Sequence, residues 1–264
     1  MSYQLYSFAG VLLPTASPQE DVGTGDSKTQ IIDLPNGLRF DPWGSDRAPL
    51  AKTTVTKACK ILAATPTALD AAYKSYEALR GVRDYLVRLR GDGSQERILA
   101  RCMQVQAQYE ARHWQFLPVT FTFELEGPYW SGAAHNQVVT LDAIPKTVVL
   151  VNNGNITVTD AVVRFDIGAG IPTISLLKVG VSGVSEWQWT YNLGYPNADN
   201  LIVNCGTRSV LHAGINAYGG FSLTANHKID DWLRLPPGST TVTITRTGGN
   251  STCTATFTYN DGWA

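Results

Sequence analysis

Short apolar stretches of four to eight residues, each closed by turn-forming residues, fill the second half of the chain. Asn, Asp and Gly cluster at 152–155, 197–200 and 248–250, and these residues tolerate the backbone angles that tight turns need. Many short strands with regular turn signals are typical of a β-sandwich or jelly roll. The expected strands are 138–141, 147–151, 161–167, 173–179, 185–191, 201–204, 209–213, 240–247 and 252–259.

The first half has a different periodicity. After a predicted strand at 53–62, Thr65 and Pro66 have the residue types favoured at the N-cap and the first position of a helix. Apolar residues then recur every three or four positions from Leu69 to Leu79, and Gly81 follows. The pattern predicts one amphipathic helix between Thr65 and Gly81.

A β-hairpin and a further strand follow this helix. The segments 85–90 and 95–101 flank Gly91-Asp92-Gly93-Ser94, a turn sequence that permits positive φ angles. Residues 118–125 then alternate strictly between apolar and polar types, which predicts a strand with one buried face. The whole chain is therefore predicted to be mainly β with a single helix.

Charge is distributed unevenly along the chain. Of the 43 charged residues, 28 precede Ser131, and the shift coincides with the Gly- and Pro-containing segment 127–132. We therefore expect two domains, residues 1–132 and residues 133–264. The first is predicted to contain the helix and hairpin, and the second to be the sandwich.

The balance of charges excludes several classes of function. Lys and Arg number 21 against 22 Asp and Glu, so the chain lacks the basic character typical of duplex-binding proteins. Its four cysteines, at 59, 102, 205 and 253, are too scattered for a metal site and are predicted to be free, buried thiols. The first 14 residues lack the features of a signal peptide or membrane span. We expect no metal, no cofactor and no membrane insertion.

Catalytic motifs are missing from the sequence. No nucleophile elbow, phosphate-binding loop or zinc-protease motif occurs, and His113, His135, His212 and His227 stand apart and are interpreted as structural or surface histidines. Asp230-Asp231 is the one acidic pair of the second half. A glycosidase needs two carboxylates that converge, whereas neighbours in a strand point to opposite faces. A solvated turn is the favoured interpretation, so no enzyme is expected. Arg90-Gly91-Asp92 is likewise explained by the hairpin turn.

Three aromatic residues raise the possibility of a sugar site. Trp187, Trp189 and Tyr191 occupy every second position of a predicted strand and so share one face. Such a face could stack on sugar rings. Because large aromatics dominate core burial, we favour a place in the sandwich core.

Arginines are frequent between Lys74 and Arg112. One interpretation is that these arginines lie on the solvated surface of the helix and hairpin. The alternatives are that they form a subunit interface or a wall that faces passing DNA. The candidate interface residues are Arg80, Arg83, Arg88, Arg90, Arg97 and Arg101.

Several segments, in their order along the chain, resemble siphophage distal tail proteins. In the first half they are 33–38 (DLPNGL), 40–44 (FDPWG), 78–81 (ALRG), 92–94 (DGS), 121–125 (FTFEL) and 128–132 (PYWSG). In the second half they are 150–155 (LVNNGN), Trp189 followed by Leu193, 221–227 (FSLTANH), 232–238 (WLRLPPG) and 257–263 (FTYNDGW). The polar opening from Ser17 to Ser27 has no counterpart in this resemblance.

This resemblance implies a function without catalysis. It implies an N-terminal belt β-sandwich with a helix and hairpin that forms a hexameric ring, and a C-terminal galectin-like or jelly-roll sandwich. The implied partners are the protein itself, the tail tube protein, the tape measure protein and the tail tip hub protein, with DNA only in transit through the lumen. The implied location is the virion, after assembly in the host cytoplasm. The alternatives are a module that docks a saccharide or a receptor-binding protein and, more distantly, a glycoside hydrolase.

Overall fold

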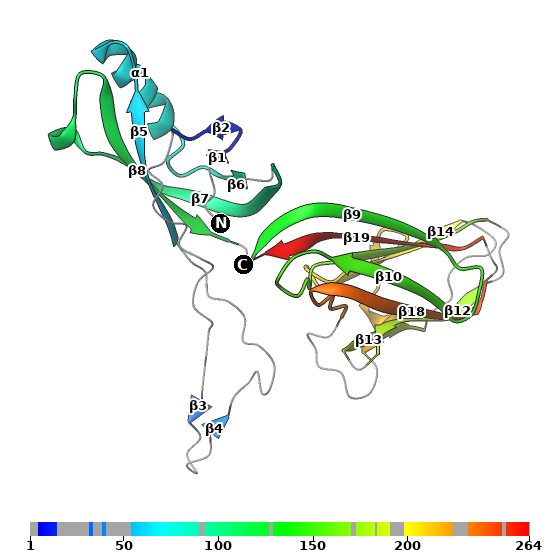
Figure 1. Ribbon diagram of the computed structural model, residues 1–264. Helices are drawn as coiled ribbons and strands as arrows, with labels where there is room; N and C mark the ends of the chain where they lie inside the picture. Colours follow the sequence, from blue (N-terminus) through cyan, green and yellow to red (C-terminus); the bar gives the residue numbers. More distant parts are fainter. Residues whose placement is uncertain are drawn as a thin grey trace. The chain divides into compact units, whose positions relative to one another are not determined.

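The structure is a computed structural model, and Figure 1 shows its ribbon. It describes residues 5–14, 32–33, 39–40, 54–89, 93–126, 129–169, 173–182, 184–190, 198–223, 232–249 and 252–263. Two compact units divide the chain, Met1–Gly132 (unit 1) and Ala133–Trp263 (unit 2). The described residues are mostly β and contain one α-helix, which confirms the predicted fold class. None of their helices has the length and apolar character needed to cross a membrane.

Unit 1 is built on an antiparallel sheet with the strand order β5-β8-β7-β6-β1-β2. Its strands are β1 (Leu5–Phe8), β2 (Val11–Leu12), β5 (Thr54–Leu62), β6 (Arg83–Leu89), β7 (Gln95–Ala107) and β8 (Phe116–Leu125). Strands β3 (Ile32–Asp33) and β4 (Arg39–Phe40) form a separate pair. The alternation predicted for residues 118–125 is present, since β8 buries every second side chain.

Helix α1 (Pro66–Glu77) begins where the sequence predicts. The Thr65 side chain accepts a hydrogen bond from the backbone N–H of Ala68 at 3.2 Å, and this bond caps the first turn. Leu69 is fully buried, and the ring of Tyr76 packs edge-on against Phe121 of β8. These contacts hold α1 on the sheet.

The hairpin is longer than the sequence indicates. Strand β6 pairs with the first part of β7, as predicted, but β7 continues beyond residue 101 to Ala107. Strand β7 pairs with β8 from Ala100 onward, and a register shift between Cys102 and Gln104 marks a bulge within that pairing. The turn at 90–92 lies outside the described residues.

Unit 2 consists of two antiparallel sheets. One contains, in order, β16-β15-β14-β11-β19-β9, and the other β10-β18-β12-β13-β17. The first group spans β9 (Trp130–Thr140), β11 (Val162–Ile167), β14 (Asp199–Asn204), β15 (Ser209–His212), β16 (Ile215–Asn216) and β19 (Thr254–Trp263). The second spans β10 (Lys146–Asn152), β12 (Ile174–Val181), β13 (Ser185–Trp189), β17 (Phe221–Leu223) and β18 (Gly238–Gly248).

A single apolar core fills unit 2. Both sheets contribute to it: Phe165 and Phe257 come from the first, and Trp187 and Trp189 from the second. The four rings are buried, and Phe165 meets Trp187 edge-on at 6.1 Å between centroids. Strand alternation explains this arrangement, because β11, β13 and β19 each direct every second side chain inward.

The predicted turn at 152–155 closes over the end of β19. The buried Asn152 side chain donates to the carbonyls of Ile156 and Leu235 and accepts from the N–H groups of Gly154 and Gly262. A Cβ atom at Gly154 would lie only 1.8 Å from the Gly262 carbonyl oxygen. The close approach of two backbones therefore requires glycine at position 154.

Candidate subunit interface

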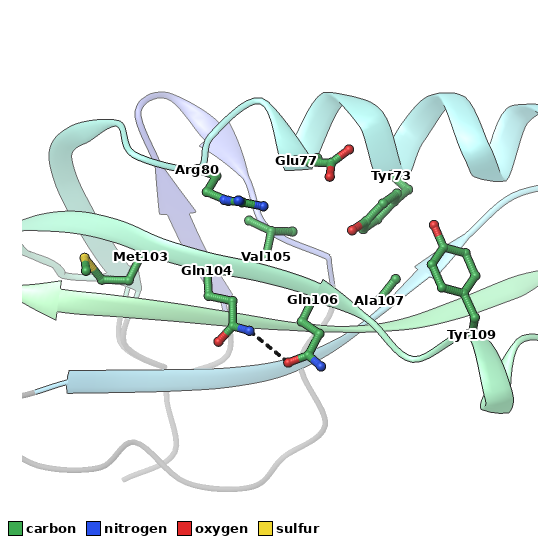
Figure 2. Close-up of a pocket in the computed structure, with 9 residues that line it drawn as sticks. All are labelled: Tyr73, Glu77, Arg80, Met103, Gln104, Val105, Gln106, Ala107 and Tyr109. Atoms are coloured by element: carbon green, nitrogen blue, oxygen red, sulfur yellow. Dashed lines mark hydrogen bonds between the residues drawn. The ribbon is translucent and has the colours of Figure 1, made fainter.

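A groove of about 550 Å³ lies between α1 and β7 in unit 1. Figure 2 shows Tyr73, Glu77 and Arg80 on the helix side, residues 103–107 on the strand side, and Tyr109 at one end. We call it the α1–β7 groove. Its lining contains one acid, one base, two glutamines and two tyrosines, so it offers both polar and apolar contacts.

The β7 bulge shapes the floor of the groove. Met103 is the extra residue, and its side chain is 49 % exposed, while Val105 turns inward and is buried. Gln104 and Gln106 are both exposed, and the Gln104 Nε2 donates to Gln106 Oε1 at 3.0 Å. An exposed methionine beside two exposed glutamines is an adaptable contact surface.

Two tyrosines form the end of the groove. The rings of Tyr73 and Tyr109 lie edge-on, with centroids 6.1 Å apart. Burial raises the pKa of Tyr73 above its ordinary value, and the charges of Glu77 and Tyr109 act in the same direction. The backbone of Ala107 and the charge of Arg80 act in the opposite direction. The Tyr73 hydroxyl is therefore neutral at physiological pH.

Four of the six predicted interface arginines are exposed: Arg80, Arg83, Arg97 and Arg101. Glu126 binds Arg83 at 2.6 Å and approaches Arg101 at 3.7 Å, and the Arg97 guanidinium lies 5.1 Å from the ring centroid of Tyr85. These side chains are available to a neighbouring molecule. Their role in subunit contact remains a prediction.

Arg88 requires a correction. Its side chain is 2 % exposed and binds Glu96, also 2 % exposed, at 2.6 Å. The guanidinium lies 4.0 Å from the ring centroid of the buried Trp130. Arg88 is therefore buried within unit 1 and, unlike the other described candidates, exposes almost no surface to a neighbour. Arg90 lies outside the described residues.

Two of the three aromatic residues considered as a sugar site are not on the protein surface. Trp187 and Trp189 are fully buried, so no ligand can reach their faces. Trp187 packs against Phe165 and Phe221, and Trp189 meets His212 edge-on at 5.6 Å. The two tryptophans therefore belong to the core, the interpretation that the sequence favoured. Tyr191 lies outside the described residues.

The described histidines have separate partners. His113 is exposed and stacks on Phe116, while His135 and His212 bind Asp261 and Asp199 at 2.9 and 2.6 Å. His227 and the pair Asp230-Asp231 lie outside the described residues. Across the part of the chain that the structure describes, no three His, Cys, Asp or Glu side chains gather as metal ligands.

All four cysteines are free and buried. Burial raises the pKa of Cys59 to about 11 and that of Cys205 to about 12. Because the thiolate is the reactive form, such shifts suppress reaction at neutral pH by about a hundredfold or more, in addition to steric protection.

We therefore expect the native protein to resist thiol reagents. At pH 7.5, iodoacetamide should label the four cysteines only slowly, and all four should react after denaturation. Mass spectrometry of the labelled peptides checks this. Rapid labelling of Cys59 or Cys205 in the folded protein, or a disulfide-linked peptide, would contradict it.

Unit 1 has an exposed cluster of side chains that the sequence did not predict. Leu62, at the end of β5, is 71 % exposed and Trp114 is 55 % exposed. Leu62 pairs with Phe116, whose ring stacks on His113 at 5.2 Å and lies 5.5 Å from the ammonium group of Lys60. We call these five residues the knob. Position 62 continues the outward side of β5, which is the one sequence signal that could have revealed it.

The structure is a two-unit β protein with a groove on its first unit. No model of a known protein family matches the sequence, and no curated protein matches it. Among solved structures, the Dit protein of phage SPP1, a hub of the adsorption apparatus in phages that infect Gram-positive bacteria, is similar. It is 15 % identical, with a TM-score of 0.60, over 97 % of this chain and 98 % of that chain.

Two structures of the phage P2 baseplate in its activated conformation, with Ca and with Sr, also match. They are 6 % and 7 % identical, with TM-scores of 0.40, over 100 % of this chain and 92 % of theirs. The chain shares the fold of the SPP1 Dit protein. This agrees with the resemblance to siphophage distal tail proteins found in the sequence.

Proposed function

We propose that this protein is a non-enzymatic structural component of a phage tail tip. The observation that carries the proposal is the fold likeness to the SPP1 Dit hub protein, which extends over both units and nearly the full length of both chains. In this role, copies join head to tail into a closed ring. The family resemblance implies six copies in that ring. The lumen of the ring lets DNA pass from the tail tube.

The surface chemistry supports such a role. The described charged residues of unit 1 include exposed arginines, which can set the orientation of a neighbour, and unit 1 also has an open groove. The rings of Phe165, Trp187, Trp189 and Phe257 are buried in the core of unit 2. The proposed partners are other copies, the tail tube protein, the tape measure protein and the tail tip hub protein. The proposed location is the virion, with assembly in the host cytoplasm.

The full chain should assemble into rings in solution. Electron microscopy in negative stain should show annular particles with a central hole, and mass photometry should give one closed oligomer rather than a ladder of sizes. Closure of a heterologous contact by rotation gives a fixed copy number. A protein that stays monomeric across the micromolar range would contradict the proposal.

We further propose that unit 1 alone forms the ring. Unit 1 has its own sheet and helix and ends at Gly132, where the chain divides. A truncated chain of residues 1–132 should therefore form rings of the same copy number as the full chain. If the full chain forms rings and a folded 1–132 chain does not, unit 2 is required for assembly.

A further inference from the structure

The α1–β7 groove and the knob are two different exposed surfaces of unit 1. Leu62 and Trp114 project from the knob with 71 % and 55 % of their surface in contact with solvent. Met103 and Tyr109 in the groove are likewise 49 % and 56 % exposed. Exposing four large side chains with apolar surface to solvent is unfavourable. Burying them on association would contribute to the free energy of binding.

The knob offers a cation and the groove offers an acid beside a base, Arg80. The knob contains a cation, Lys60, whose ammonium group lies beside the Phe116 ring, while the groove contains an acid, Glu77. Lys60 and Leu62 are two positions apart on β5 and both are exposed, so their side chains project on the same side. A groove lined by both Glu77 and Met103 offers a partner for each of them.

We infer that the knob of one copy seats in the α1–β7 groove of the next copy. The inference rests on the proposed function, because it specifies the contact that joins neighbours in the ring. Lys60 of one copy pairs with Glu77 of its neighbour, and Leu62 packs on Met103. The Trp114 indole meets the guanidinium of Arg80, an attraction between a cation and an aromatic face. Each copy then contributes two different surfaces, its knob to one neighbour and its groove to the next, as a head-to-tail contact requires.

Charge reversal in the full chain tests the pairing. Lys60→Glu and Glu77→Lys should each raise the protein concentration needed for half-assembly by about tenfold, as loss of one central contact does. The double variant K60E/E77K restores opposite charges and should recover most of the assembly. Lys74→Glu is the matched control, since Lys74 is exposed on α1 but does not line the groove. Circular dichroism should show that all four variants are folded.

Mass photometry over a dilution series measures the half-assembly concentration. Recovery in the double variant supports the inference. Rings that form equally well in all variants overturn it but leave the proposed function intact. Loss of assembly in both single variants without recovery in the double variant also overturns it, because Lys60 and Glu77 then do not face each other. A wild-type chain that never forms rings refutes the proposed function itself.

A photo-crosslinking residue in place of Met103 gives an independent readout. In assembled protein, it should link two copies, and the linked peptide should contain residues 54–62 or 112–116. The same residue in place of Val138, which is 62 % exposed in unit 2, serves as the control. Linkage from position 103 to any other part of a second copy would refute the knob as the occupant of the groove.

Discussion

Replacing Trp187 by alanine is expected to unfold unit 2 or to lower its melting temperature by about 10 °C or more. Trp187 is fully buried between the two sheets and packs against Phe165 and Phe221. Truncating a buried aromatic typically costs about 3–5 kcal/mol. That is a large share of the roughly 5–15 kcal/mol that stabilises a domain. Near-ultraviolet circular dichroism during heating would follow the loss of this core.

Two matched variants on the same strand sharpen the test. Trp189→Ala should behave like Trp187→Ala, because both side chains point inward from β13. Gln188→Ala, on the opposite face, should change stability by no more than about 0.5 kcal/mol, as is usual for surface substitutions. If both tryptophan variants melt like the parent, the place of these residues in the core would be refuted.

Local patterns predicted the secondary structure of unit 1 well. Thr65 and Pro66 define the start of α1, and the cap formed by Thr65 involves only neighbouring residues, so the sequence contains the whole signal. The extension of β7 to Ala107 was missed because its cause is not local. Beyond Arg101, β7 keeps its pairing with β8 after its pairing with β6 has ended, and such pairing depends on residues more than ten positions away.

Whether an individual side chain is buried or exposed was harder to predict. Arg88 and Arg97 lie in the same hairpin and have the same chemistry, yet one is buried and the other exposed. Position along the strand assigns Arg88 to the inward face with Leu86, but arginine on that face contradicts the usual pattern. Only the folded protein shows that Glu96 and Trp130 surround it.

The groove could not be found from the sequence, because its residues come from three elements. Tyr73 of α1, Met103 of β7 and Tyr109 meet only after the helix has packed on the sheet. None of these residues belongs to a motif. The same holds for the knob, since the pairing of β5 with β8 brings Leu62 to Phe116.

The buried pair in unit 1 leads to the second large expected effect. Arg88 and Glu96 are each 2 % exposed and bind at 2.6 Å, and β6 and β7 place them directly opposite each other in the sheet. Removing one partner leaves an uncompensated charge in the core, which costs about 3–5 kcal/mol. We therefore expect Glu96→Ala to destabilise unit 1 by this amount. Arg88→Ala should do so too and should also remove the contact with Trp130.

Replacing both partners separates the cost of an orphaned charge from the value of the pair. Arg88→Met with Glu96→Leu fills the same space with apolar side chains. Such replacements are often neutral or stabilise by about 1–4 kcal/mol, because two charges no longer lose their hydration. The double variant should therefore be far more stable than either alanine variant in urea unfolding followed by circular dichroism. It should also assemble like the parent, since Arg88 faces no neighbour. Loss of rings by a double variant that is fully folded would show that Arg88 contributes to the subunit interface after all.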